Sequence, residues 1–129
     1  MAKALNDLTV LVVDDVAQAR QLMKMVLNGL GVNQIFMAVD GKKALDLLGA
    51  ADGLIDLVIC DWMMPRMTGL ELLQQIRSVY PQMPFMMVTG RADLDSVKSA
   101  KTYNVNAYIS KPFSPQQFEK KLVALAQQL

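Results

Sequence analysis

Five short apolar runs alternate with stretches of helical spacing along the 129 residues of the chain. Most runs are continuously apolar rather than alternating, which suits strands of a parallel sheet that is covered on both faces. This order predicts right-handed crossovers and a three-layer, doubly wound α/β fold whose five-stranded parallel sheet has the flavodoxin-like order 2-1-3-4-5. We expect a single domain over residues 1–129 with no output domain. The strands are expected at residues 8–13, 34–38, 57–60, 85–88 and 106–109.

Apolar residues three and four positions apart predict the helical faces that pack on this sheet. Residues 68–71 and 114–117 have the pattern of capping boxes, with Pro115 at the favoured first helical position. The helical signal is weakest at residues 93–102. The expected buried faces are Leu22, Met25, Val26 and Leu30; Ala44, Leu45 and Leu48; Leu72, Leu73 and Ile76; and Phe118, Leu122, Leu125 and Leu129.

The composition excludes several chemistries. The chain has no histidine, so Ser-His-Asp and Cys-His nucleophile systems and histidine-ligated metals are ruled out. Its one cysteine, Cys60, excludes an internal disulfide, a C-x-x-C redox pair and a thiolate zinc site. Any chemistry must therefore come from carboxylates, hydroxyls, lysines and backbone groups.

Neither charge nor hydropathy indicates a nucleic acid or a membrane as a partner. Lys plus Arg is 13 and Asp plus Glu is 12, which gives a net charge of +1. The longest apolar stretch, residues 8–13 with Thr9 included, is far too short to span a bilayer. Residues 1–9 lack the basic-then-apolar layout of a signal peptide. We therefore expect a cytoplasmic protein that contacts other proteins.

Polar side chains follow the strands at the edge where folds of this kind bind ligands. In an open doubly wound sheet, ligands bind outside the carboxyl ends of the strands where the strand order reverses, here between the first and third strands. Asp14 and Asp15 follow the first strand, and Asp61 follows the third. Thr89 and Lys111 follow the fourth and fifth strands and are expected to complete the rim.

Three carboxylates in one crevice predict a divalent cation. Two carboxylates about 5 Å apart repel each other by roughly 3 kcal/mol at an effective dielectric of about 20, and Lys111 supplies only one positive charge. A hard ion with oxygen ligands and several waters suits Mg²⁺. We expect Asp15, Asp61 and the backbone carbonyl of Met63 to be ligands, with Asp14 reaching the ion through water.

Asp61 is the expected nucleophile, because it stands alone at the tip of the third strand. A carboxylate that attacks phosphorus forms an aspartyl phosphate. Phosphoryl transfer requires mainly positioning and charge neutralisation. Mg²⁺, Lys111 and the Thr89 hydroxyl would supply this neutralisation to the phosphoryl oxygens, so no histidine base is required.

Five motifs extend this interpretation over the whole chain. They are Leu-Val-Val-Asp-Asp at 11–15 with Arg20, Asp-Gly-Lys-Lys-Ala-Leu at 40–45, Asp-Trp-Met-Met-Pro-Arg-Met-Thr-Gly-Leu-Glu-Leu at 61–72, Met-Val-Thr-Gly at 87–90, and Lys-Pro-Phe at 111–113. In this order and at this spacing, they resemble the receiver domains of response regulators. The resemblance is greatest to the single-domain, chemotaxis-type receivers.

The resemblance implies a role for each site residue. Asp61 would accept phosphate from a partner histidine kinase, Asp14 and Asp15 would bind Mg²⁺, and Thr89 and Lys111 would contact the phosphoryl group. Such a domain is a regulatory phosphoacceptor rather than an enzyme, with only slow loss of its own phosphate.

The resemblance also implies a switch and an output surface. Tyr108 would swing inward as Thr89 moves toward the phosphate, and the peptide between Lys111 and Pro112 would be cis. The face formed by residues 93–129 would be read by a downstream protein, such as the flagellar motor switch of a chemotaxis pathway.

Two positions depart from the chemotaxis-type pattern. Met63, two residues after Asp61, is apolar where a polar residue is expected, and Arg91, two residues after Thr89, is basic where an acidic residue is frequent. Both flank the expected path of the hydrolytic water. We therefore predict that Met63 shields the acyl phosphate and lengthens the lifetime of the phosphorylated state.

Several residues allow a structural interpretation as well. Asp15 could cap the first helix, with Gln18 completing a box-like spacing. Trp62 could face solvent near a partner or pack inside. Met63, Met64 and Met67 are expected to be partly exposed in the loop after Asp61.

Three other functions fit the same fold. An aspartyl-phosphate phosphatase needs a second carboxylate two residues beyond its nucleophile, where this chain has Met63. A flavin or nucleotide carrier needs a loop rich in Gly, Ser or Thr after the first strand, where residues 14–18 are Asp-Asp-Val-Ala-Gln. A phosphate-independent interaction module would have no use for the intact set of carboxylates.

Overall fold

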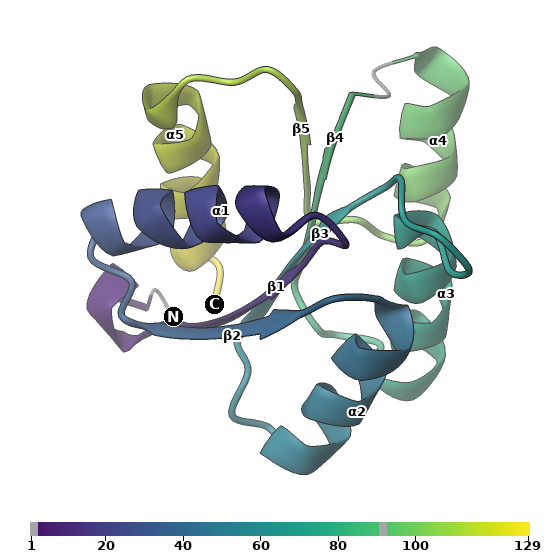
Figure 1. Cartoon of the computed structure of the whole chain (residues 1–129), viewed down its shortest axis with the longest axis horizontal. Helices are drawn as coiled ribbons and strands as arrows, with labels where there is room; N and C mark the ends of the chain where they lie inside the picture. Colours follow the sequence, from purple (N-terminus) through teal and green to yellow (C-terminus); the bar gives the residue numbers. More distant parts are fainter. Residues whose placement is uncertain (1–2, 91–92) are drawn as a thin grey trace.

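A computed structural model describes residues 3–90 and 93–129, and it has the predicted three-layer α/β architecture (Figure 1). All strand pairs are parallel, and the strand order is β2-β1-β3-β4-β5. The strands are β1 (Thr9–Val13), β2 (Gln34–Ala38), β3 (Leu57–Asp61), β4 (Phe85–Thr89) and β5 (Ala107–Ser110). The helices are α1 (Ala17–Gly29), α2 (Gly41–Ala51), α3 (Gly69–Val79), α4 (Leu94–Thr102) and α5 (Pro115–Ala126), preceded by the short 3₁₀ helix η1 (Leu5–Asp7).

The sheet is covered on both faces, as the continuous apolar runs require. Helices α1 and α5 lie on one face and α2, α3 and α4 on the other (Figure 1). Every residue of β1 and β4 is buried, and so are the first four residues of β3. The two core clusters, one on each face, hold the sheet in the middle layer and leave its ends as the accessible edges.

The strand ends differ from the prediction by about one residue, and two of these differences concern the site. Asp61 is the last residue of β3 and Thr89 the last residue of β4, whereas the sequence predicted both just beyond the strands. The sheet ladder explains the extension, because Asp61 lies opposite Val88 and Thr89 lies opposite Ser110. Both side chains are therefore held by backbone pairing rather than by loops.

The predicted buried face of α1 is wrong for two residues. Leu22 and Met25 are 60% and 68% exposed, whereas Met23 and Leu27 are buried. Five of the six residues from 22 to 27 are apolar, so helical spacing did not define one face and packing against the sheet decides it. Val26 is half-buried.

The other predicted helical faces agree with the structure. Ala44 and Leu48 of α2 are buried, with Leu45 half-buried beside them. Both capping boxes are present, from Thr68 to Glu71 at α3 and from Ser114 to Gln117 at α5. The predicted faces of α3 and α5 also lie in the core, with Leu72, Leu73, Ile76, Phe118, Leu122 and Leu125 buried and Leu129 half-buried.

No helix among the described residues is long and apolar enough to cross a membrane.

Candidate functional site

The parallel register brings the predicted acidic residues to one edge of the sheet. Val13 lies opposite Cys60, so the residues that follow β1 stand beside the end of β3. Asp14, Asp15 and Asp61 each offer a carboxylate oxygen, and these oxygens lie within 4.8 Å of one another. The three predicted carboxylates therefore form one cluster at the predicted position.

Asp14 is the buried member of the cluster, and its surroundings fix its orientation. Its side chain accepts a hydrogen bond from the backbone N–H of Val16 at 3.0 Å, and its carbonyl accepts one from Arg20 Nη1 at 2.8 Å. Burial raises the pKa of Asp14 above its ordinary value, and repulsion from Asp61 adds to the increase, while the Val16 hydrogen bond and Lys111 oppose it. The carboxylate is thus held in place at an electrostatic cost.

Asp15 is exposed and does not cap α1. The N-cap of that helix is Val16, which makes no side-chain capping hydrogen bond. The capping interpretation of Asp15 is therefore wrong, because the helix begins one residue later than capping by Asp15 would require. Its carboxylate is directed to the acidic cluster instead.

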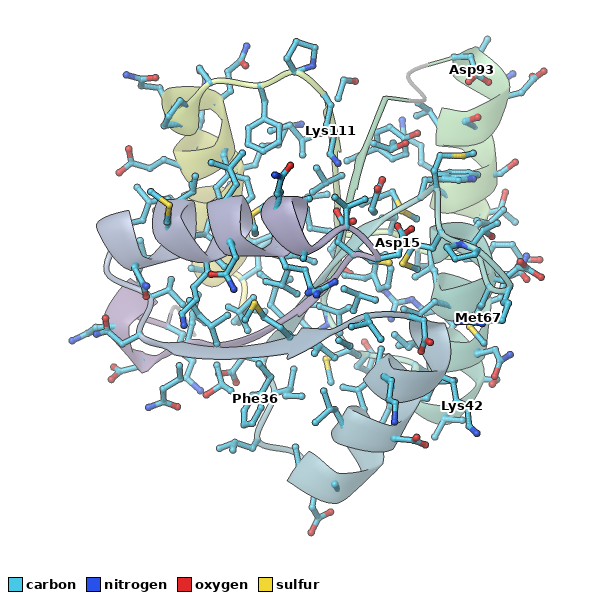
Figure 2. All side chains as sticks on the ribbon, in the orientation of Figure 1. Asp15, Phe36, Lys42, Met67, Asp93 and Lys111 are labelled. Atoms are coloured by element: carbon cyan, nitrogen blue, oxygen red, sulfur yellow. The ribbon has the colours of Figure 1, made fainter. Side chains whose placement is uncertain are left out.

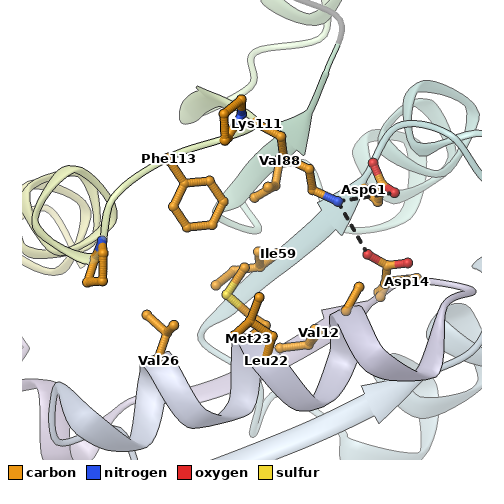
Figure 3. Close-up of a pocket in the computed structure, with 14 residues that line it drawn as sticks. Val12, Asp14, Leu22, Met23, Val26, Ile59, Asp61, Val88, Lys111 and Phe113 are labelled. Atoms are coloured by element: carbon orange, nitrogen blue, oxygen red, sulfur yellow. Dashed lines mark ion pairs between the residues drawn. The ribbon is translucent and has the colours of Figure 1, made fainter.

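Lys111 faces two of the three carboxylates (Figure 3). Its Nζ lies 3.6 Å from Asp61 Oδ2 and 3.8 Å from Asp14 Oδ2. Its backbone N–H donates to the carbonyl of Thr89 at 2.8 Å, which ties the β5–α5 loop to the end of β4. The peptide between Lys111 and Pro112 is cis, as the resemblance implied. Both ion-pair distances exceed ordinary hydrogen-bond length, so the ammonium is held mainly by charge.

The donor set fits Mg²⁺. Carboxylate oxygens are the ligands that a hard divalent ion prefers, and Asp15 and Asp61 leave room for waters because neither is fully buried. At an effective dielectric of about 20, each carboxylate pair at this spacing repels by roughly 3 kcal/mol, which a divalent ion offsets. Coordination by the Met63 carbonyl stays a prediction.

The loop between β3 and α3 is more tightly packed than predicted. Met64 is buried, so its expected partial exposure is wrong, and Trp62 is also buried in the core cluster that includes Leu72 and Leu73. Met63, in contrast, is 59% exposed. The packing of Trp62 and Met64 leaves Met63 as the apolar side chain that faces solvent beside Asp61.

Close backbone approach explains the glycine at the start of α3. The Gly69 N–H donates to the carbonyl of Trp62 at 2.8 Å. A side chain at Gly69 would collide with the backbone of Asp61 and Trp62. Glycine at this position therefore lets the loop close directly over the end of β3.

One positioning contact near the site was missed by the sequence analysis. Asp40 caps α2 by accepting a hydrogen bond from the Lys43 N–H at 2.9 Å, and its second oxygen lies 3.4 Å from Arg66 Nη2. Met67, which lies near Lys42 in Figure 2, packs against the first residue of α2, Gly41, and would have to move if that residue carried a side chain. An aspartate before a glycine could have indicated the cap, but no local signal indicated that α2 would hold this loop.

The predicted switch residues lie next to this loop. Thr89 is fully buried, and Tyr108 on β5 is half-buried. The rings of Trp62 and Tyr108 meet edge to face, with centroids 6.5 Å apart and planes at 68°. Tyr108 therefore contacts the residue that follows Asp61. Arg91, the second residue predicted to affect phosphate lifetime, lies outside the described residues.

The fold and the pocket together define a class of protein, namely a doubly wound α/β domain with an acidic cation pocket at the carboxyl ends of its strands. The profile of the response regulator receiver domain matches residues 10–123. The chain belongs to the response-regulator receiver family. Receiver domains are regulatory domains that bind Mg²⁺ at an acidic pocket, and the cluster of Asp14, Asp15 and Asp61 corresponds to such a pocket.

Individual proteins show the same relationship over nearly the full chain. The chain is 40% identical over 114 residues to a chemotaxis protein CheY homolog of Campylobacter jejuni, a match that covers 87% of each chain. It is 35% identical to chemotaxis protein CheY-3 of Vibrio cholerae over 126 residues, covering 96% of this chain and 95% of the relative. A solved receiver domain from Clostridium thermocellum superposes with a TM-score of 0.83 at 28% identity, covering 92% and 93% of the two chains.

Proposed function

We propose that this protein is the phosphoacceptor switch of a two-component system, in which Asp61 receives a phosphoryl group from a histidine kinase. The observation that supports this proposal most strongly is the pairing of three carboxylates within 4.8 Å with a lysine that faces two of them. Lys111 supplies a positive charge that neutralises a phosphoryl group during its transfer, and Asp61 supplies the nucleophilic carboxylate.

The chain's own residues perform distinct parts of the proposed transfer. An oxygen of Asp61 attacks phosphorus, and the bond between phosphorus and the donor breaks, with its electron pair leaving on the donor. Lys111 neutralises one phosphoryl oxygen, and the Thr89 hydroxyl donates to another. When bound, Mg²⁺ supplies charge neutralisation for the carboxylates and the phosphoryl oxygens, and Asp14, Asp15 and Asp61 would hold it, with the Met63 carbonyl as a further ligand.

Slow loss of the phosphate, rather than turnover, follows from the side chain two residues beyond Asp61. In a phosphatase that position carries an acid–base carboxylate. Here it is Met63, an exposed apolar side chain that can neither donate nor accept a proton. We therefore propose a regulatory phosphoacceptor rather than an enzyme.

The switch that we propose connects Asp61 to β5. Thr89 moves toward the phosphoryl group, and Tyr108 turns inward into the space that this movement opens. The contact between Trp62 and Tyr108 supports this pathway, because it joins the loop after Asp61 to the aromatic residue that must move. Phosphorylation would then shift the balance between two conformations.

We propose that the output surface is the face formed by residues 93–129, which includes α4, β5 and α5. The relatives are named chemotaxis proteins, which supports chemotaxis as the pathway. We propose the flagellar motor switch as the downstream protein. The exchange would take place in the cytoplasm, where the sequence analysis expects the chain.

The decisive experiment measures incorporation of phosphate into the wild type and Asp61→Asn with phosphoramidate and Mg²⁺. We expect mass spectrometry to find one phosphoryl group on the wild type and none on the variant. Asp46→Asn, an exposed carboxylate on α2, is the matched control and should be phosphorylated like the wild type. Incorporation into Asp61→Asn, or none into the wild type, would overturn the proposal.

A further inference from the structure

The margin of the sheet at β2 presents backbone groups that can pair with another strand. β2 pairs with β1 on one side only, and its other side is the edge of the sheet, between α1 and α2 (Figure 1). The carbonyl of Ala38 accepts a hydrogen bond from the Asp14 N–H at 3.2 Å, so the backbone groups of Ala38 face β1. Because these groups alternate along a strand, those of Phe36 also face β1, and those of Ile35 and Met37 face outward. No other strand among the described residues pairs with that outer side.

β2 also lacks the features that usually protect a sheet edge. Edge strands avoid pairing with other chains by being very short or by carrying charges or proline. The other edge strand, β5, has only four residues, and Pro112 follows two residues after it. β2 has five residues, Gln-Ile-Phe-Met-Ala, with no charge and no proline. An extended strand is therefore the partner that fits the outer side of β2.

A groove lies between this edge and α2. Its volume is about 410 Å³, and Met37, Val39 and Leu47 form part of its apolar lining. Val39 is 46% exposed, so the groove is open to solvent. Two oppositely charged side chains of α2, Lys43 and Asp46, also line the groove, and both are exposed. The edge therefore combines apolar lining with one charge of each sign.

We propose that β2 of one copy of this chain pairs with β2 of a second copy in antiparallel orientation, so that the two sheets join into one. Antiparallel pairing of identical edges closes around a twofold axis, which gives a dimer rather than an open chain of molecules. With the axis at Phe36, Ile35 of each copy lies opposite Met37 of the other copy and exchanges two hydrogen bonds with it. The inference concerns an edge of the sheet that the proposed phosphoryl transfer does not use.

Charge complementarity favours a second copy over a different protein. The twofold axis places α2 of one copy beside α2 of the other, running in the opposite direction, so that Lys43 of each copy can face Asp46 of the other. β2 itself is uncharged, so no like charges stand opposite one another along the paired strands. β5, which belongs to the proposed output surface, stays free because it is the opposite edge of the sheet.

Sedimentation equilibrium and amide hydrogen exchange test the pairing in the full chain. Because a single pair of edge strands is a small interface, we expect monomers at about 10 µM and dimers at about 1 mM. The amides of Ile35 and Met37 should exchange at least about tenfold more slowly at the higher concentration, whereas the Phe36 amide, which faces β1, should not change. A chain that stays monomeric at about 1 mM, or outward amides whose exchange does not depend on concentration, would overturn the proposal.

A proline on the edge tests whether the dimer uses the backbone of β2. Met37→Pro removes an outward N–H and leaves the hydrogen bonds between β1 and β2 in place, so it should abolish the dimer. Dimers that persist in this variant would show that the copies meet through another surface and would refute the inference.

A charge exchange tests whether the partner is a second copy in the proposed orientation. Lys43→Asp and Asp46→Lys each place like charges across the interface, and each should weaken dimerisation by about tenfold or more. An equimolar mixture of the two variants should restore dimerisation, because each lysine then again faces an aspartate of the other molecule. Lys42→Asp makes the same change at an exposed neighbour that does not line the groove, and it should dimerise like the wild type. Single variants that dimerise like the wild type, or that the mixture does not rescue, would contradict the proposed pairing.

Discussion

The two ends of the sheet use charged side chains in opposite ways. At the amino ends of β4 and β5, the guanidinium of Arg77 donates to the carbonyls of Met83, Tyr103 and Asn104 and to the Asn106 side chain, at 2.6 to 2.9 Å. At the carboxyl ends, Lys111 lies 3.6 and 3.8 Å from two carboxylates that repel each other. The Arg77 guanidinium makes four short hydrogen bonds within the fold, whereas the Lys111 ammonium is held loosely beside a surplus of negative charge.

This difference shows which charges stabilise the fold and which serve a ligand. A buried or half-buried charge stabilises a fold when short hydrogen bonds satisfy it. At the carboxyl end the Val16 N–H donates to Asp14 and the ion pairs with Lys111 are long, so burial still raises the pKa of Asp14. We infer that the acidic cluster reduces the stability of the metal-free fold and that the Arg77 cluster increases it.

The largest expected effect is at the amino end. Arg77→Met should lower the free energy of unfolding by about 3 kcal/mol, because three backbone carbonyls and Asn106 lose a charged donor. Urea denaturation measures this loss, and Mg²⁺ affinity should not change. Arg66→Met is the control, since its ion pair with Asp40 is largely exposed and contributes at most about 1 kcal/mol. Equal losses of unfolding free energy in Arg77→Met and Arg66→Met would contradict the inference that the Arg77 cluster stabilises the fold.

At the carboxyl end, Lys111→Met should reduce the rate of phosphorylation strongly and the free energy of unfolding only slightly. The rate of phosphorylation by phosphoramidate should fall by about 100-fold, as is typical when one charge-stabilising donor is removed. The free energy of unfolding should change by less than about 1 kcal/mol, because the ammonium is partly exposed and its ion pairs are long. Mass spectrometry and urea denaturation measure the two quantities. A loss of stability as large as that of Arg77→Met would show that Lys111 belongs to the fold.

Asp14→Asn should stabilise the metal-free protein at pH 7 by about 1 kcal/mol. The amide can still accept the Val16 hydrogen bond, while repulsion of roughly 3 kcal/mol from a neighbouring carboxylate disappears and attraction to Lys111 is lost. Because folding raises the pKa of Asp14, the contribution of this group to wild-type stability is fully present below pH 3.8 and is lost as pH rises through the folded pKa.

The gain from Asp14→Asn should therefore grow above pH 3.8 and vanish below it. Thermal unfolding of both proteins in EDTA, from below pH 3.8 to pH 7, tests whether the stability difference between variant and wild type has this sign and pH dependence. The gain should also shrink when Mg²⁺ is added, because the ion offsets the repulsion among three carboxylates in the wild type and between only two in the variant. A variant that is less stable than the wild type in EDTA at pH 7 would show that the cluster is not under electrostatic strain.

The smallest effect concerns the lifetime of the phosphate. Met63→Asn should speed dephosphorylation by about threefold, a change of roughly 0.7 kcal/mol in the barrier, because an exposed apolar side chain beside Asp61 is replaced by one that can position water. The decay of phosphorylated protein after removal of the donor measures this rate. Val79→Asn, an exposed apolar residue at the far end of α3, should leave the decay unchanged.

The sequence predicted those features of the site that depend on strand order alone. Continuous apolar runs indicated the parallel sheet, and the sheet determines where Asp14, Asp61 and Lys111 meet, so their convergence follows without knowledge of loop structure. Asp61 and Thr89 were each assigned one residue outside their strands, which did not alter the edge on which they lie.

Features that depend on packing between distant segments were not predicted. Arg77 contacts residues 26 to 29 positions away, and no local pattern indicates such partners. The burial of Met64 and the exposed face of α1 depend on which apolar side chain fits against the neighbouring layer, and several neighbours in the sequence compete for that place.

The buried position of Cys60 makes it possible to follow movements of this protein with a dye attached at one chosen site. The thiol is fully buried in β3, and burial raises its pKa well above the ordinary value, so little reactive thiolate forms at neutral pH. A maleimide dye should therefore not react with the native, folded chain. Lys98→Cys, at an exposed position on α4, would give a single attachment point, and labelled protein could report movement of that helix without prior removal of Cys60.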